Sequence, residues 1–312
     1  MDLRLTLLNL WLRLAVKAQL RRVQDPLKMR AQLARSAARH FSPPDGANFH
    51  RETIRRDEDR AAATMDALWA SCGRPDRRKV LLYLHGGAYI AGSPDTHRHL
   101  GAALAGAAGV RALLPAYRLA PEHPFPAALE DAVTTYRHLL DAGYEAPSIA
   151  LAGDSAGGGL AFSLQLRLAE LDLPKPGCVV GFSPWTDMTG TLPSLAQNAR
   201  RDAMLPARRF QVAAGFYLGE ADPMNPLISP LRGAWSDPPP TLLMASRHEI
   251  LLDDTRHLAE ALRRAGGDVQ IQLWRRLPHA WPFFTGRLAQ ADQAVAIAGA
   301  FIARHLGAEP EG

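Results

Sequence analysis

The sequence predicts an α/β protein whose core is a mostly parallel sheet. Three observations indicate this fold class: apolar runs typical of buried strands, helical segments that alternate with those runs, and an ordinary globular composition over 312 residues, 47% hydrophobic and 21% charged. Parallel strands are joined by helices that cover both faces of their sheet, so each strand is a nearly continuous apolar run. We therefore expect one large sheet with helices on both sides.

The predicted elements follow one another in a regular order. Apolar runs predict strands over residues 79–85, 110–117, 148–153, 177–183, 241–246 and 269–275. Helical periodicity predicts helices over residues 126–143, 156–171, 207–218, 253–265 and 288–306. Pro126 in the first turn and Gly143 at the end mark the boundaries of the first of these helices.

The first 23 residues predict an amphipathic helix. Its apolar face would hold Leu3, Leu7, Leu10, Trp11 and Leu14. Charged residues interrupt the apolar run too soon for a signal peptide or a membrane span. Two interpretations remain open: the helix docks on the rest of the protein, or it lies on a membrane surface.

Two further segments stand outside the alternation of strands and helices. Residues 41–50 are rich in turn formers and predict a linker. Residues 186–240 hold one helical stretch among proline-rich segments. An insertion of that length between two sheet strands usually forms a cap over something.

Charge and cysteine content limit the classes of function. The formal net charge is +5, but basic and acidic residues are mixed except in residues 1–40, so we expect no nucleic-acid partner. Cys72 and Cys178 belong to neither a C-x-x-C pair nor a histidine cluster. We expect both cysteines to be reduced, which favours a cytoplasmic location.

The segment GDSAG, residues 153–157, fits the pattern G-x-S-x-G between a predicted strand and a predicted helix. In that setting the turn holds the serine hydroxyl exposed above the sheet as a nucleophile. Ser155 would then need backbone N–H donors for the oxyanion. We expect these donors from Ala156, the residue after the nucleophile, and from the loop at Gly86 and Gly87 that follows an earlier strand.

A serine nucleophile also needs a base and an acid that orients the base. His279 follows the last predicted strand and is the best-placed base. Glu249 directly follows the strand before it, which favours Glu249 as the acid. Asp253 is the alternative acid, although its place at the start of a helix also suits a helix-capping role.

Two other histidines, His97 and His99, form an H-x-H pattern. A zinc site needs at least three protein ligands, and the sequence offers no third ligand nearby. We therefore expect no metal site.

With these residues in place, the sequence resembles the bacterial hormone-sensitive-lipase family of α/β-hydrolase esterases. The resemblance runs over about residues 79–285 and rests on six segments: LLYLHGGAYIAG (81–92), YRLAPEHPFPAALED (117–131), GDSAGG (153–158), FSPWTD (182–187), DPMNPLISPL (222–231) and LPHAW (277–281). It implies a Ser–acid–His triad, cleavage of esters with short to medium acyl chains, and no metal or organic cofactor. It also implies a cap made by residues 1–45 and the insertion at 186–240, on a catalytic domain spanning 46–312.

The sequence departs from the family pattern at two positions. The usual H-G-G-G becomes H-G-G-A, so the oxyanion donors that the resemblance implies are Gly87 and Ala88, with Gly86 as a further donor. Alanine keeps its N–H, provided that its backbone angles suit a Cβ. The family motif D-P-L-R-D-E aligns with EILLDD, so the acid maps to Glu249 rather than to an aspartate.

Several other motif residues have expected roles around the site. Tyr117, Arg118, Glu122 and Asp131 are expected to make buried hydrogen bonds beneath or beside it. The aromatic residues that would wall the substrate pocket are Tyr89, Trp185, Trp281, Phe283 and Phe284.

Two alternatives to an esterase remain open. The same acyl-enzyme chemistry serves a lactonase or an aryl-amide hydrolase, whereas some relatives of this fold are non-catalytic small-molecule receptors that have lost the histidine. A homodimer through an edge strand or the last helix is an expectation by analogy only.

Overall fold

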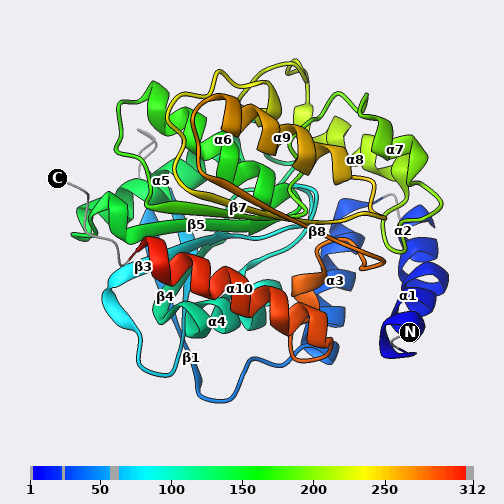
Figure 1. The fold of residues 1–312 in the computed structure, drawn as a ribbon, viewed down its shortest axis with the longest axis horizontal. Coiled ribbons are helices and arrows are strands. Elements are labelled where there is room, and N and C mark those ends of the chain that lie inside the picture. The colour runs from blue at the N-terminus through cyan, green and yellow to red at the C-terminus, as the bar shows by residue number, and fades with distance from the viewer. Residues whose placement is uncertain (1–2, 23–24, 57–62, 307–312) are drawn as a thin grey trace.

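The computed structural model describes residues 3–22, 25–56 and 63–306. Within these residues the chain forms one eight-stranded sheet in the order β1-β2-β4-β3-β5-β6-β7-β8 (Figure 1). The strands are β1 Ala47–Arg55, β2 Thr64–Cys72, β3 Asp76–Leu84, β4 Val110–Pro115, β5 Ile149–Asp154, β6 Cys178–Phe182, β7 Thr241–Ser246 and β8 Val269–Trp274. Neighbours from β4 to β8 run parallel, while β1 and β2 are antiparallel additions at one edge. The expected α/β fold with a mostly parallel sheet is confirmed.

The two antiparallel strands are the strands that the sequence prediction missed, and the helices at 26–40, 94–108 and 193–197 were not predicted either. Residues 47–50, expected in a linker, form the first half of β1. β1 lies at the sheet edge, and mostly half-buried or exposed residues make it up. The sequence of β1 therefore lacks the continuous apolar run that identified the central strands.

Helices cover both faces of the sheet, as expected. The helices that pack on it are α4 Pro94–Ala108, α5 Ala127–Asp141, α6 Ala156–Glu170, α9 Leu252–Arg264 and α10 Ala289–His305, with short 3₁₀ turns at Ala146–Ser148 and Trp281–Phe284. Alternate residues of β3 supply the two cores: Leu82 and Leu84 pack beneath α5 and α6, whereas Leu81 and Tyr83 pack beneath α4 and α10. This alternation explains why the strand is apolar at every position from Val80 to Leu84.

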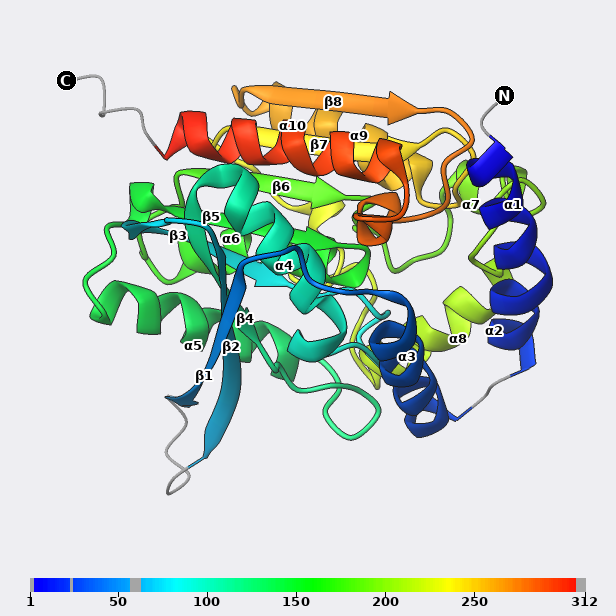
Figure 2. The same cartoon turned by 90° about the horizontal axis from the view of Figure 1, so that it is seen from below.

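The N-terminal helices, α7 and α8 gather at one end of the molecule, beyond the carboxyl ends of the central strands, and the chain after Gly233 returns along α6 to the start of β7 (Figure 2). This end contains α1 Leu3–Trp11, a π-helical turn Leu12–Lys17, α2 Ala18–Arg22, α3 Pro26–His40, α7 Pro193–Gln197, α8 Ala207–Leu218 and a 3₁₀ turn Pro230–Arg232. In open parallel sheets, ligand sites form at the carboxyl ends of the strands.

The first helix docks on the rest of the protein, but not through the apolar face that the sequence predicted. Leu12 is buried, and Leu5, Leu8 and Val16 pack partly against the core. The five residues of the predicted apolar face remain exposed. No helix within the described residues combines the length and apolarity that crossing a bilayer requires.

Candidate active site

Ser155 occupies a sharp turn between β5 and α6. Its φ and ψ are 54° and −121°, in a region that non-glycine residues rarely adopt. Two backbone hydrogen bonds hold the turn: Ser155 N–H donates to the Phe182 carbonyl at 2.9 Å, and Trp185 N–H donates to the Ser155 carbonyl at 2.9 Å. The turn also needs glycine at position 157, because a Cβ there would lie 2.1 Å from the Leu84 carbonyl oxygen. Such strain, of order 1–3 kcal/mol, persists only where the surroundings enforce it.

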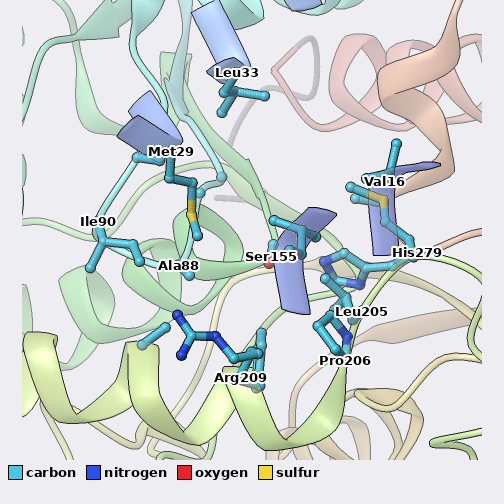
Figure 3. Close-up of a pocket in the computed structure, with 18 of the residues that line it drawn as sticks. Val16, Met29, Leu33, Ala88, Ile90, Ser155, Leu205, Pro206, Arg209 and His279 are labelled. Carbon is cyan, nitrogen blue, oxygen red and sulfur yellow. The ribbon is translucent and has the colours of Figure 1, made fainter. Parts of the chain in front are cut away.

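His279 and Glu249 form a buried hydrogen-bonded pair. Nδ1 of His279 lies 2.9 Å from Oε2 of Glu249, and both side chains are almost completely buried. On the other side of the ring, Nε2 has no hydrogen-bond partner among the described residues. His279 and Ser155 line the same cavity (Figure 3). An imidazole held in this way can accept a proton from a serine hydroxyl.

The loop that carries Glu249 is itself fixed by hydrogen bonds. Oε1 of Glu249 accepts the Ser246 N–H at 3.0 Å, and the Glu249 carbonyl accepts the Asn198 amide at 2.9 Å. Asp202 accepts the N–H of Ile250 at 3.0 Å. Sequence reasoning missed Asn198 and Asp202, because nothing local marks a polar residue in a long insertion as the partner of a distant loop.

The pKa values of both members of the pair lie above their usual values. Burial alone would lower the pKa of His279, but the hydrogen bond and charge of Glu249 outweigh burial, so the pKa lies above its usual value. Burial also raises the pKa of Glu249, against the opposing effect of the hydrogen bond from His279. The carboxylate is therefore placed to stabilise an imidazolium as it forms.

In the described part of the chain, two N–H groups of the loop after β3 and one at the start of α6 have no acceptor. Among the described residues, the N–H groups of Gly87, Ala88 and Ala156 donate to no acceptor, and Gly87 and Ala88 line the cavity. Gly86 is different, since its N–H donates to Oδ1 of Asp154 at 2.9 Å. The expectation that Gly86 serves as a further oxyanion donor is therefore wrong.

The loop has an unusual backbone. Gly87 has a φ of 132°, and a Cβ there would lie 2.1 Å from the Ala91 carbonyl oxygen. Ala88 has a φ of 56°, so its methyl group tolerates the left-handed region at some cost in strain. Ala88, which stands where the family usually has a third glycine, thus adopts the left-handed backbone conformation of the loop and still has an N–H to donate.

A hydrogen-bond network under this loop explains why the N–H of Gly86 already has an acceptor. Asp154 also accepts the Tyr83 hydroxyl at 2.7 Å and lies 3.5 Å from Nε2 of His97. Burial alone would raise the pKa of Asp154, but these three partners lower it to about 2. The ionised carboxylate therefore anchors the first residue of the loop. The other histidine of the H-x-H pattern, His99, lies near the Phe283 carbonyl, with Nε2 at 2.8 Å.

The cavity beside Ser155 is mostly apolar and has a volume of about 280 Å³. Figure 3 shows Met29 and Leu33 of α3 on one side of Ser155 and Arg209 of α8 on the other. Pockets for drug-sized ligands span about 300–1,000 Å³, so this cavity lies just below that range. Residues from 11–36 and from 204–216, within the two segments expected to form a cap, contribute its walls.

Comparison with known proteins gives this geometry a family. A family described as having the alpha/beta hydrolase fold matches residues 81–283. The chain belongs to this family. An acetyl-hydrolase of Streptomyces hygroscopicus is 41% identical over 77% of this chain and 80% of its own length, and an esterase of Acinetobacter venetianus is 34% identical over 70% and 72%. A crystal structure of an esterase from the bacterial hormone-sensitive-lipase family superposes with a TM-score of 0.91 at 34% identity, covering 98% of this chain and 99% of that one. The protein is thus a carboxylic ester hydrolase of the hormone-sensitive-lipase family, as the sequence motifs indicated.

In this α/β hydrolase the alternative acid, Asp253, is engaged elsewhere. Its Oδ2 accepts the Ser194 N–H at 2.8 Å, and its own N–H donates to the Ser194 hydroxyl at 3.0 Å. Asp253 therefore joins α9 to α7 rather than contacting His279. Its place in the first turn of α9 agrees with the competing, structural interpretation.

Three of the five aromatic residues expected to wall the pocket lie outside the hydrolase's cavity. Tyr89 stacks on Tyr217 with ring centroids 3.7 Å apart, Trp185 packs on Phe210 at 3.8 Å, and Trp281 packs against Trp274 at 5.6 Å. Phe283 and Phe284 do line the cavity, together with Phe210 and Phe216. The missed pocket residues come mostly from α3 and α8, whose side chains only the folded cap brings to the site.

The 117–131 block of the hydrolase makes most of the buried hydrogen bonds expected of it. The Tyr117 hydroxyl donates to the His85 carbonyl at 2.6 Å, and Arg118 pairs with the buried Asp131. Glu122 differs, because its half-exposed carboxylate forms a two-pronged ion pair with Arg30 of α3.

Proposed function

We propose that this ester hydrolase works through a Ser155–His279–Glu249 triad and an acyl-enzyme intermediate. The observation that carries the proposal is the orientation of His279: Glu249 holds Nδ1 at 2.9 Å, and the unpartnered Nε2 is buried beside the cavity that Ser155 lines. His279 removes the proton from Ser155 as the hydroxyl oxygen attacks the ester carbonyl. It then protonates the leaving alcohol, and water repeats the sequence on the acyl-enzyme.

The oxyanion of the tetrahedral intermediate rests on the N–H groups of Gly87, Ala88 and Ala156 in this proposal. These groups have no other acceptor among the described residues, which leaves them free for developing charge. Ala156 also begins α6, whose N-terminus favours a negative charge above it. One such donor is typically worth about 10²–10³ in rate.

The substrates that fit are esters of short to medium acyl chains. A cavity of about 280 Å³ with mainly aliphatic and aromatic walls suits a compact apolar acyl group. The name acetyl-hydrolase given to the Streptomyces hygroscopicus relative agrees with this size. Residues 1–45 and 186–240 serve as the cap that closes over the acyl group, with residues 46–312 as the catalytic domain.

Hydrolysis of p-nitrophenyl esters from acetate to palmitate tests the proposal. We expect an optimum at short chains and a fall of roughly 10⁶ in kcat for Ser155→Ala, as for removal of other serine nucleophiles. A Ser155→Ala variant that keeps more than a hundredth of the activity would exclude Ser155 as the nucleophile. An optimum at palmitate would exclude the assignment of chain length.

A further inference from the structure

The N-terminal helix carries an exposed apolar stripe, which we define as Leu3, Leu7, Leu10, Trp11 and Leu14. Leu3 and Leu14 are each 70% exposed, and the others are 44–56% exposed. Elsewhere in the described residues only Leu27, Val212 and Met224 are large apolar side chains of similar exposure. Single exposed leucines need no explanation, but a cluster on one surface marks an interaction site.

The stripe is not needed for docking the helix on the protein. Docking uses the opposite side, where Leu12 is buried and Lys17 donates from Nζ to the carbonyls of Ala199 at 2.9 Å and Asp202 at 2.6 Å. Leu12 and Lys17 are five residues apart and are the two ends of the π-helical turn. In a regular α-helix Lys17 would point toward the stripe, whereas the wider π turn returns it to the docked side. The helix is thus held on the protein while the side chains of the stripe stay in solvent.

A cationic groove borders the stripe. Beside Leu10 it is lined by Arg13, Arg200, Arg201 and Arg276 and has a volume of about 500 Å³. Arg200 and Arg201 are exposed, and residues 3–22 contain five basic residues and no acidic one. The pKa of His248 in the same groove is lowered by burial and by the surrounding arginines, a sign of local excess positive charge. Such a groove attracts anionic groups.

The same helix also forms part of the mouth of the catalytic cavity. Trp11, Ala15, Gln19 and Leu20 line that cavity, and Val212 of α8 lines it as well. Figure 2 shows the N-terminal helices, α7 and α8 grouped at one end of the molecule. A surface that bound the stripe would therefore lie next to the opening that leads to Ser155.

We propose that the apolar stripe and the cationic groove together dock the enzyme on an anionic lipid surface. Leucines and a tryptophan on one helical face, flanked by arginines, are the chemistry of helices that lie in the headgroup region. A second copy of this chain is a poorer fit, because a two-fold contact through the stripe would place two cationic grooves near each other. Docking here would present the cavity mouth to esters dissolved in that surface.

Sedimentation with vesicles tests the docking surface on the full chain. Wild type is compared on vesicles of phosphatidylcholine alone and of phosphatidylcholine mixed with phosphatidylglycerol, at low and high salt. We expect binding to the anionic vesicles that weakens at high salt, since screening reduces the contribution of the arginines. Lack of binding to anionic vesicles at low salt would overturn the proposal.

Three variants separate the two parts of the surface. Leu3→Gln/Leu7→Gln/Leu14→Gln should lose vesicle binding by roughly tenfold or more, and Arg200→Gln/Arg201→Gln should lose most of the preference for anionic vesicles, by roughly tenfold. Met224→Gln, at a residue 51% exposed but remote in sequence from the stripe, is the matched control and should bind as wild type. All three should hydrolyse soluble p-nitrophenyl acetate at the wild-type rate with an unchanged Tm.

The outcomes distinguish this proposal from its competitors and from the proposed triad. If the triple leucine variant binds vesicles as wild type does, the stripe is not the docking surface. If wild type is a dimer and that variant a monomer, the stripe is a contact between copies and the lipid proposal fails. Ser155→Ala should bind vesicles normally while losing hydrolysis, so failure of the triad and failure of the docking surface give different results.

Discussion

Replacing Glu249 by glutamine is the sharpest test of the proposed triad, because an amide cannot make both hydrogen bonds of the carboxylate. The carboxylate accepts two N–H groups: Oε2 faces Nδ1 of His279 at 2.9 Å, and Oε1 accepts the Ser246 N–H at 3.0 Å. Glutamine has one oxygen and one NH₂ group in those places. If its oxygen stays with Ser246, the NH₂ group faces Nδ1 and forces the ring proton onto Nε2. If the amide flips, the NH₂ group opposes the N–H of Ser246 in a buried site.

The expected loss in rate follows from the first of these orientations. With its proton on Nε2, His279 cannot accept the proton of Ser155. A triad histidine held in the wrong tautomer loses about 10⁴ in kcat, which corresponds to about 5 kcal/mol of transition-state stabilisation. The assay is kcat/KM on p-nitrophenyl acetate, with circular dichroism and Tm to show that the variant is folded.

Asp253→Asn is the matched control for the same substitution in the neighbouring helix. Asp253 bonds to Ser194 rather than to His279, and an asparagine oxygen can still accept the Ser194 N–H. We expect its activity to stay within a few-fold of wild type. A folded Glu249→Gln enzyme within tenfold of wild type, or an equal loss in Asp253→Asn, would refute the assignment of the acid.

Four further predictions concern the surroundings of the triad. Glu249 raises the pKa of His279 above its usual 6.5, and His279 must be neutral to act as the base. We therefore expect kcat/KM to fall as the pH decreases through a value above 6.5. A kcat/KM that is flat from pH 5 to 9 would contradict this. Ala88→Gly should relieve about 1–2 kcal/mol of left-handed strain but cost about 0.4–1 kcal/mol because the unfolded chain gains entropy. We therefore expect a Tm near that of wild type and an activity within a few-fold of it. A tenfold loss of activity would give the methyl group a role in the cavity. Arg30→Ala should raise KM more than Glu122→Gln does. The reason is that Arg30 also donates to the Ile90 and Ala120 carbonyls, at 2.8 Å each, beside the oxyanion loop. Equal increases in KM would show that only the ion pair matters. The ion pair lowers the pKa of Glu122 to about 2, so its contribution to stability is complete above pH 4.5 and is lost as the pH falls toward 2.

The parts of the fold that the sequence predicted are those determined locally. The central strands contain runs of apolar residues because both faces of the sheet are buried, and the turn at Ser155 needs glycine where a Cβ would meet the backbone at 2.1 Å. Both requirements leave a mark in a few adjacent residues. The edge strand β1 leaves no such mark, since half of its surface faces solvent and its partners come from later in the chain.

The composition of the site was predictable where chemistry restricts the residue type, and less so where packing decides. Ser155, His279 and Glu249 carry functional groups that few other residues offer, and each follows a strand. The pocket walls need only apolar bulk, which many residues supply. Trp185 and Trp281 therefore seemed as suitable as Phe283 and Phe284, although only the two phenylalanines line the cavity.

The N-terminal helix shows most clearly what periodicity cannot decide. It has two apolar sides, one with Leu3, Leu7 and Leu14 and the other with Leu5 and Leu12, and either could have been the docked one. The choice depends on the acceptors of Lys17 at residues 199 and 202, which lie more than 180 positions away in the chain. A helix with two apolar sides that docks through one of them must expose the other. Folding does not account for that second row of leucines, so their replacement by glutamine should leave Tm unchanged, whereas a fall in Tm would mean that the stripe supports the cap rather than a lipid surface.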